Sequence, residues 1–349
     1  MTAFTVAVAP ATGAAPATGS GPSGPPDPEP IMRLASGFMA AKHLFAASEL
    51  GLFEALADAP ATLAALAAHT GLTPRAARIS ADAMVALGLL EAGGGIYRNS
   101  PAAAAFLAGP GPGDLRPFLR YWDKISYPAW ARLADALASG PPQEISELSP
   151  DLQQVASEGI EAALAGPAHA LPAAFDFGAH RQLLDIGGGT GSWSIAIARH
   201  HEHIEAAVLD RPPTVKLARR KVAAAGLARR ISVVAGNAMA GELPGGYDVF
   251  LLANVIHCFS PEQNQDLLRR VRRAARPGSA LLLADSWTNP AHTEPRHAAL
   301  MAGEYAVHVR TGDVYSAEEA HAWLNRTGWR SAGYRPLAGP QSLVIAQAD

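Results

Sequence analysis

A glycine-rich turn near the middle of the chain is the first place where residue types and spacing could do chemistry. An apolar run leads into Gly187, Gly189 and Gly191, and a second apolar run downstream ends at Asp210. This pattern offers a ligand a tight turn, the N-terminus of a following helix, and a carboxylate for ribose hydroxyls. It predicts a nucleoside-type cofactor. A dinucleotide fingerprint would need glycine where Ser192 stands, so the spacing does not favour a nicotinamide cofactor.

A histidine follows another apolar run, at the edge where a parallel sheet binds ligands. The run 248–253 reads as a strand, and His257 comes shortly after it. Histidine suits a general base because its ordinary pKa lies near neutral pH. His257 is therefore predicted to take a proton from a substrate, and the alternative is a structural histidine at a strand end. The neighbouring Cys258 is disfavoured as a nucleophile, because adjacent side chains on a strand point apart.

Three more side chains share one face of a helix expected over 296–308. Met301, Glu304 and His308 fall at helical spacing along it. Two histidines and one carboxylate can also hold a metal with open positions. His257, Glu304 and His308 could therefore form such a metal site, and the alternative is a polar pocket wall without metal.

An aromatic cluster lies in a helical region between the two ends of the chain. Trp122 and Tyr127 belong to it, together with Tyr121 and Trp130. Their position between the expected domains makes Trp122 and Tyr127 candidates for a wall of the substrate pocket. The alternative is packing in the core.

The first ordered region reads as helix, turn, helix and a small β wing. The second helix of the turn runs over about 75–87, and a hairpin with its tip at 93–95 follows. This winged-helix pattern is compatible with DNA binding, but Arg75 and Arg78 alone offer few cations for phosphates. A packing or dimerisation module is favoured. A winged-helix regulator that senses the cofactor remains an alternative.

From residue 181 onward, strands and helices alternate, which predicts an α/β sheet with a final hairpin. Strands are expected at 182–186, 205–210, 231–235, 248–253 and 280–285, with a closing hairpin of 329–335 and 342–346. Helices are expected at 192–200, 213–225, 262–274, 296–308 and 316–326.

Length and composition limit the remaining classes of function. The 349 residues suffice for more than one core, and the net charge of −3 gives no bulk attraction to nucleic acid or anionic membranes. No apolar run approaches the ~20 residues that span a bilayer. A single cysteine excludes an internal disulfide and suits a cytoplasmic protein. Four segments are expected: a disordered tail over 1–30, the winged helix over 31–110, pocket helices over 111–175 and a catalytic domain over 176–349.

Taken together, these motifs resemble a known family. The glycine turn, Asp210, His257 and the segments 276–278 and 336–340 are similar to S-adenosylmethionine-dependent class I methyltransferases of the caffeate and acetylserotonin O-methyltransferase type. The resemblance covers about 31–349. It implies a Rossmann-like sheet, a homodimer formed through the winged-helix module, and methylation of a small molecule, of secondary-metabolite type, with neither nucleic acid nor membrane as partner.

The resemblance also implies roles for individual residues. It places Asp185, Gly187 and Gly189 along the methionine and ribose of the cofactor, and it makes Asp210 the acceptor for both ribose hydroxyls. It sets the pair Asn237–Ala238 beside the adenine, where the family usually has aspartate first. It makes His257 the base for O-methylation, and it implies that the helix with Met301, Glu304 and His308 lines the substrate pocket.

The chain departs from the family at several of these positions. Cys258 and Phe259 replace the Asp-Trp pair that usually follows the histidine, Asp285 stands where a glutamate is expected, and a second glutamate is missing. Glu304 stands where bacterial relatives commonly carry asparagine. These departures keep a second interpretation open, in which a metal held by His257, Glu304 and His308 assists C-methylation of an α-keto acid, similar to bacterial C-methyltransferases of nonribosomal peptide pathways.

Overall fold

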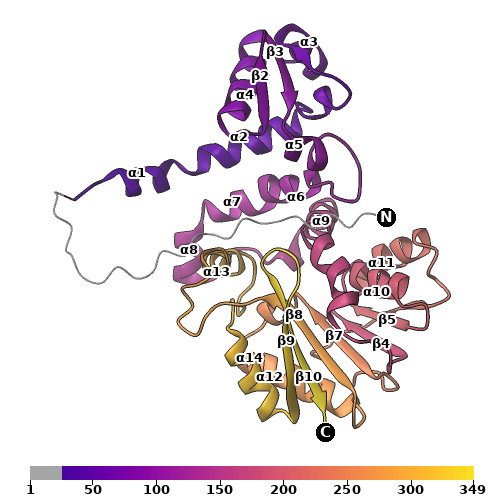
Figure 1. The fold of residues 1–349 in the computed structure, drawn as a ribbon. Helices are drawn as coiled ribbons and strands as arrows, with labels where there is room; N and C mark the ends of the chain where they lie inside the picture. The colour runs from indigo at the N-terminus through magenta and orange to yellow at the C-terminus, as the bar shows by residue number, and fades with distance from the viewer. Residues whose placement is uncertain (1–25) are drawn as a thin grey trace.

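The computed structural model describes residues 26–349, and it stacks three parts on one another (Figure 1). A small N-terminal module lies at one end, a layer of helices follows, and a seven-stranded sheet with flanking helices forms the other end. Among the described residues, none of the helices combines the length and hydropathy needed to cross a membrane. The mixed α/β fold with a helical N-terminal domain confirms the predicted fold class.

The N-terminal module has the predicted helix–turn–helix and wing. Its elements are α1 (Glu29–Ser36), α2 (Phe38–Glu49), η1 (Glu54–Leu56), β1 (Ala61–Thr62), α3 (Leu63–Thr70), α4 (Pro74–Ala86), β2 (Leu90–Gly93) and β3 (Ile96–Asn99). The short strand β1 pairs with β3, a contact that the sequence did not predict. Most of the tail predicted over 1–30 lies outside the described residues, but the prediction was wrong at its end, since α1 already begins at Glu29.

The helical layer connects the module to the sheet. It consists of α5 (Pro101–Phe106), α6 (Arg116–Tyr121), the π-helical turn η2 (Trp122–Ser126), α7 (Tyr127–Trp130), α8 (Leu133–Ser139), η3 (Ile145–Glu147) and α9 (Pro150–Ala174). The predicted breaks near 109–113 and 140–142 are present as loops. The π-turn was not predicted.

The sheet has the order β6-β5-β4-β7-β8-β10-β9. Its strands are β4 (Gln182–Ile186), β5 (Glu205–Asp210), β6 (Ile231–Ala235), β7 (Val249–Ala253), β8 (Ala280–Ser286), β9 (Trp329–Pro336) and β10 (Gln341–Ala348). The first five of these are parallel, and β10 runs antiparallel between β8 and β9. Every predicted strand is therefore present within about two residues of its expected bounds.

The central strands read as continuous apolar runs because both faces of the sheet are covered. On one face, α9, α10 (Ser192–His200) and α11 (Pro212–Ala224) contribute to one core; on the other, α12 (Pro261–Ala274) and α14 (Ala317–Arg326) contribute to a second. The remaining helix, α13 (Arg296–His308), lies under α7 and α8 at the boundary with the helical layer (Figure 1). The carboxyl ends of the parallel strands thus face the helical layer.

Candidate active site

The glycine turn after β4 has a backbone that only glycine adopts readily. Gly187, Gly189 and Gly191 have φ values of 70°, 57° and 81°, in the left-handed region. A Cβ added at Gly187 would come within 2.9 Å of Val255, whereas a Cβ at Gly189 would meet no atom within 4 Å. The turn therefore packs tightly against the loop after β7 and keeps an open face at Gly189. Gly191 forms the N-cap of α10, so a helix N-terminus begins here.

Asp210 lies at the end of β5, beside the turn, and fixes it. Its Oδ2 accepts a hydrogen bond from the amide of Gly189 at 2.8 Å, and its Oδ1 accepts one from the amide of Arg211 at 2.7 Å. A carboxylate offers about four lone-pair directions. Each oxygen therefore keeps capacity for a further donor, such as a ribose hydroxyl.

Asp185 lies beneath the turn and is fully buried. Ser194 donates to its Oδ2 at 2.7 Å, while its Oδ1 is buried without a partner. Burial and the nearby charge of Asp210 raise the pKa of Asp185 to about 7. An unpartnered buried oxygen beside an open glycine turn is what a donor-bearing ligand would complete. The residues present therefore fit a ligand that brings hydrogen-bond donors to this turn, as a nucleoside cofactor does.

Asn237 and Ala238 follow β6 at the same edge of the sheet. Asn237 is exposed, and its Oδ1 accepts from the amide of Met239 at 3.0 Å. Ala238 is partly buried and packs against the core under the sheet. The asparagine oxygen has one donor and keeps a second lone pair, so both this oxygen and the amide NH2 group can still bind a ligand.

His257 lies in the short turn η4 (Ile256–Cys258) after β7, rather than on the strand itself. Its Nδ1 lies 3.0 Å and 3.1 Å from the two carboxylate oxygens of Asp285, at the end of β8. A carboxylate only accepts, so Nδ1 carries a proton and Nε2 is left to accept one. Burial would lower the pKa of His257, but the Asp285 carboxylate overrides this and holds the pKa well above its ordinary value. The side chain keeps 14% of its surface exposed.

Two further contacts hold this histidine, and the sequence predicted neither. The ring of Tyr305 stacks on the imidazole with centroids 4.1 Å apart and planes 7° apart. The loop after α13 packs so closely that a Cβ on Gly312 would lie 2.0 Å from the His257 carbonyl oxygen. Tyr305 directly follows a predicted pocket residue, which is the one signal that could have found it.

Glu304 and His308 lie together but apart from His257, so the predicted three-residue metal site is wrong. His308 Nε2 lies 3.2 Å from Glu304 Oε1, and both side chains are buried. Among residues 26–349, no group of three or more His, Cys, Asp or Glu side chains is placed to hold a metal. The physical reason is that the chain itself satisfies Glu304: Tyr121 donates to it at 2.8 Å, and Ser126 and Trp130 also donate.

The aromatic cluster is divided differently from the prediction. Tyr121 and Trp130 face α13, whereas Trp122 packs into the cores of the N-terminal module and helical layer. The ring of Tyr127 lies under the ammonium of Lys42, 4.7 Å from its centroid. Trp122 and Tyr127 therefore contact the N-terminal module rather than α13. Met301 is partly buried on α13, one turn before Glu304.

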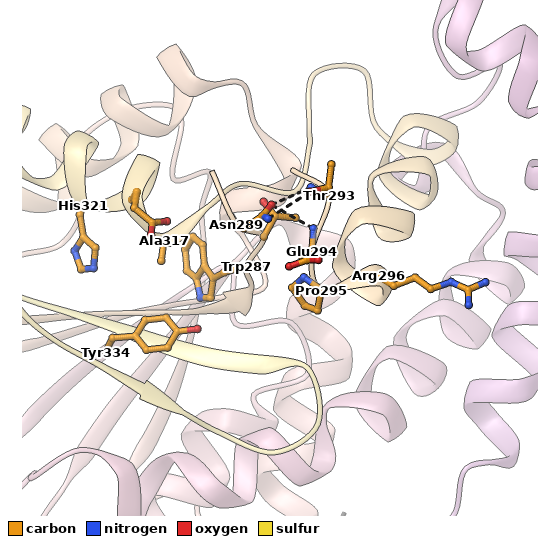
Figure 2. Close-up of a pocket in the computed structure, with 11 residues that line it drawn as sticks. Trp287, Asn289, Thr293, Glu294, Pro295, Arg296, Ala317, His321 and Tyr334 are labelled. Atoms are coloured by element: carbon orange, nitrogen blue, oxygen red, sulfur yellow. Dashed lines mark hydrogen bonds between the residues drawn. The ribbon is translucent and has the colours of Figure 1, made fainter. Parts of the chain in front are cut away.

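Two hollows lie outside this constellation. One of about 920 Å³ opens between the β8–α13 loop, α14 and β9, with Trp287, His321 and Tyr334 in its wall (Figure 2). It contains no predicted site residue, so volume alone does not make it the reaction site. A second of about 590 Å³ lies between α9 and the start of α11 and includes Arg211, next to Asp210. This one borders the candidate cofactor site.

Comparisons with known families and sequences agree with one another. Residues 135–330 match a family described as the O-methyltransferase domain, and residues 32–109 match the O-methyltransferase dimerisation domain. The chain is 30% identical to the tetracenomycin polyketide synthesis 8-O-methyl transferase TcmO of Streptomyces glaucescens, over 92% of this chain and 96% of that protein. It is 32% identical to acetylserotonin O-methyltransferase of Mus musculus molossinus, over 90% of this chain and 87% of that protein.

Solved structures of methyltransferases also match this chain. The structure of PigF with SAH matches with a TM-score of 0.83 and 29% identity, over 92% of this chain and all of that one; PigF is a protein of a Serratia species. Human N-acetylserotonin methyltransferase in complex with SAM matches with a TM-score of 0.84 and 24% identity, over 94% of this chain and 99% of that one. At 24% identity, the match to the human enzyme shows a shared fold only.

Proposed function

The chain belongs to the O-methyltransferase family and is an S-adenosylmethionine-dependent methyltransferase; on this premise, we propose that it methylates a hydroxyl oxygen of a small molecule with His257 as general base. The observation that carries the proposal is the His257–Asp285 pair at the edge of the sheet that also bears the glycine turn. Relatives named for a polyketide and for a hydroxynaphthoate support an acceptor of secondary-metabolite type.

The cofactor is expected at the turn after β4. Asp210 would accept from the ribose hydroxyls, Asp185 with Gly187 and Gly189 would line the methionine and ribose, and Asn237 with Ala238 would border the adenine. These assignments are supported by the open face at Gly189 and by the unpartnered oxygen of Asp185. When bound, S-adenosylmethionine supplies an electrophilic methyl group on a positively charged sulfur.

His257 would remove the proton from the acceptor. Asp285 holds the protonated Nδ1, so Nε2 would take the proton as the acceptor's O–H bond breaks. The acceptor oxygen would bond to the methyl carbon as the bond from that carbon to sulfur breaks, and the sulfur would leave as a neutral thioether. The Asp285 carboxylate then stabilises the imidazolium. O-methylation is preferred to metal-assisted C-methylation because the family match is to O-methyltransferases, and because His257, Glu304 and His308 are not grouped as metal ligands in the described residues. Met301 and His308 remain candidates for the acceptor pocket.

We further propose that the enzyme works as a homodimer in the cytoplasm. The dimerisation domain supports a dimer, and so does α1, which buries none of its residues within one chain. Its apolar side chains are widely exposed: Ile31 72%, Met32 66% and Leu34 68%. A lone cysteine, Cys258, suits a reducing compartment.

A pair of variants tests the two halves of the site. We expect His257→Gln to slow methyl transfer to hydroxyl acceptors by about 10²–10⁴-fold, with binding of S-adenosylhomocysteine unchanged. We expect Asp210→Ala to weaken that binding by about tenfold or more, since a charged hydrogen bond contributes about 1.5–3 kcal/mol. The measurements are transfer of a labelled methyl group to a panel of phenols, and calorimetry.

Asp210→Asn is the control for the second variant, because it keeps an acceptor oxygen beside Gly189. Wild-type transfer by His257→Gln would exclude this residue as the base. Transfer to amines but to no hydroxyl in the panel would exclude O-methylation as the reaction.

A further inference from the structure

Three consecutive residues of α13 connect the helical layer to the candidate base. We propose that Glu304 is a positioning residue, which ties the orientation of His257 to the helices that cover it through its neighbours Gly303 and Tyr305. This inference rests on the proposed role of His257. It assigns Glu304 a different part from the pocket or metal ligand that its sequence position predicts.

Glu304 is a buried carboxylate with an unusual number of donors. It is only 3% exposed, and it accepts from Tyr121, Ser126 and Trp130, while His308 lies 3.2 Å away. The three donors come from the continuous segment α6–η2–α7, whereas the neighbouring His308 belongs to α13 itself. These contacts hold the pKa of Glu304 below its usual value, although burial alone would raise it. One carboxylate therefore joins the covering helices to α13.

The residue before it lets these helices approach. A Cβ on Gly303 would lie 2.6 Å from the Trp130 indole, so only glycine leaves room for that ring. The indole nitrogen then donates to Glu304 from the same ring. The Trp130 side chain thus contacts α13 at two adjacent residues, Gly303 and Glu304, and these contacts set the distance between α7 and α13.

The residue after it lies on the base. Tyr305 stacks on His257 with its ring almost parallel to the imidazole. Because Glu304 and Tyr305 are adjacent on one helix, a shift or rotation of α13 that loosens the first also moves the second. The edge of the imidazole ring is held through Nδ1 by Asp285. The base is therefore held by β8 directly and by the helical layer through α13.

The chemistry explains why a carboxylate stands at this position. Tyr121, Ser126 and Trp130 all donate to Glu304, and an indole nitrogen can only donate. A glutamine would turn an amide N–H toward one of these donors and leave buried groups unpaired, which is costly. The carboxylate also adds negative charge behind Tyr305, whose pKa burial and nearby acids raise well above its ordinary value.

The test measures His257 without any acceptor. The titratable groups around its imidazole are Asp285 from β8, Tyr305 from α13 and Cys258 from its own turn. A stacked aromatic ring stabilises an imidazolium by cation–π attraction. Loosening the stack should therefore make His257 easier to deprotonate, so that it reacts with diethyl pyrocarbonate at lower pH. Mass spectrometry of the His257 peptide reads this reaction in the full-length protein.

We expect Glu304→Gln to move the pH midpoint of this modification down by about half a unit. Trp130→Phe should move it in the same direction, and the double variant should shift less than the sum of the two. Glu319→Gln is the matched control: this helix carboxylate caps α14 and pairs with His292, and it is not among the groups that shift the pKa of His257. It should lower the melting temperature and leave the midpoint unchanged.

The proposal is overturned if Glu304→Gln lowers the melting temperature but leaves the midpoint in place, since Glu304 is then merely structural. Additive shifts in the double variant would also overturn it, because the two residues would not act together. Failure of the wild-type enzyme to methylate any hydroxyl would reject the proposed function alone, because the modification experiment needs neither acceptor nor cofactor.

Discussion

At the scale of single residues, some of the groups that contact the candidate base could be predicted from the sequence and others could not. His257 follows an apolar strand, and Asp285 lies near the end of the neighbouring strand β8, but the sequence placed Asp285 beside the histidine only through the family resemblance. Tyr305 was missed because its only signal was its place next to Glu304, and helical spacing does not indicate which group a ring will contact. Glu304 and His308 were correctly expected to be neighbours, but their donors come from a distant segment.

The raised pKa of His257 makes a prediction about pH. A general base works only when neutral, so the rate of methyl transfer should rise as pH passes upward through this pKa, well above the ordinary 6.5. Asp285→Asn removes the charge that raises the pKa, and the midpoint should then move to lower pH while the plateau rate falls about 100-fold. A pH–rate profile measures both. An unmoved midpoint would show that Asp285 does not set this pKa.

At the scale of elements, the π-turn η2 decides which side chains reach α13. A π-helix brings residues five apart into register, so Tyr121 and Ser126 both meet Glu304, and Trp130 follows one α-turn later. Ordinary helical spacing does not anticipate this. The sequence interpretation consequently chose Trp122 and Tyr127, each one residue beyond the side chains that face α13.

The loop after α13 supplies a prediction at this scale. Gly312→Ala would place a methyl group in contact with the His257 carbonyl, so η4 must move. A displacement near 1 Å at a reacting group costs about 100-fold in rate. We expect kcat to fall by that order with binding of S-adenosylhomocysteine unchanged, as measured by steady-state kinetics and calorimetry. Gly245→Ala is the control, because its added methyl would meet nothing within 4 Å. Wild-type kcat in Gly312→Ala would refute the proposed coupling of this loop to the base.

At the scale of the whole molecule, the fold was more predictable than the site. The parallel strands are short apolar runs with glycine or acidic residues at their ends, and α-helical spacing marks the segments between them. These are local signals, so every strand of the large sheet was found. The junction between the helical layer and the sheet depends on contacts between segments far apart in the chain, which no local pattern encodes.

The exposed face of α1 carries a prediction about assembly. Replacing Ile31, Met32 and Leu34 with serine should convert the proposed dimer to monomers, because burying each such side chain contributes about 1.5–3 kcal/mol. The dimer dissociation constant should weaken by about 10³-fold or more, measured by analytical ultracentrifugation. Val234→Ser is the control, because it changes another exposed apolar residue, on the edge strand β6. It should leave the mass of the dimer in ultracentrifugation unchanged. An intact dimer in the triple variant would exclude α1 from the interface.

The position of β10 has a consequence for biosynthesis. This strand is made after every other strand of the sheet, yet it lies inside the sheet, between β8 and β9. While the ribosome is still translating residues 287–340, the edge of β8 that later pairs with β10 has no neighbouring strand. This strand is apolar and buried in the finished protein. An unpaired apolar edge invites pairing with other chains. The nascent chain is therefore most vulnerable to aggregation in this interval, and chaperone binding should concentrate there.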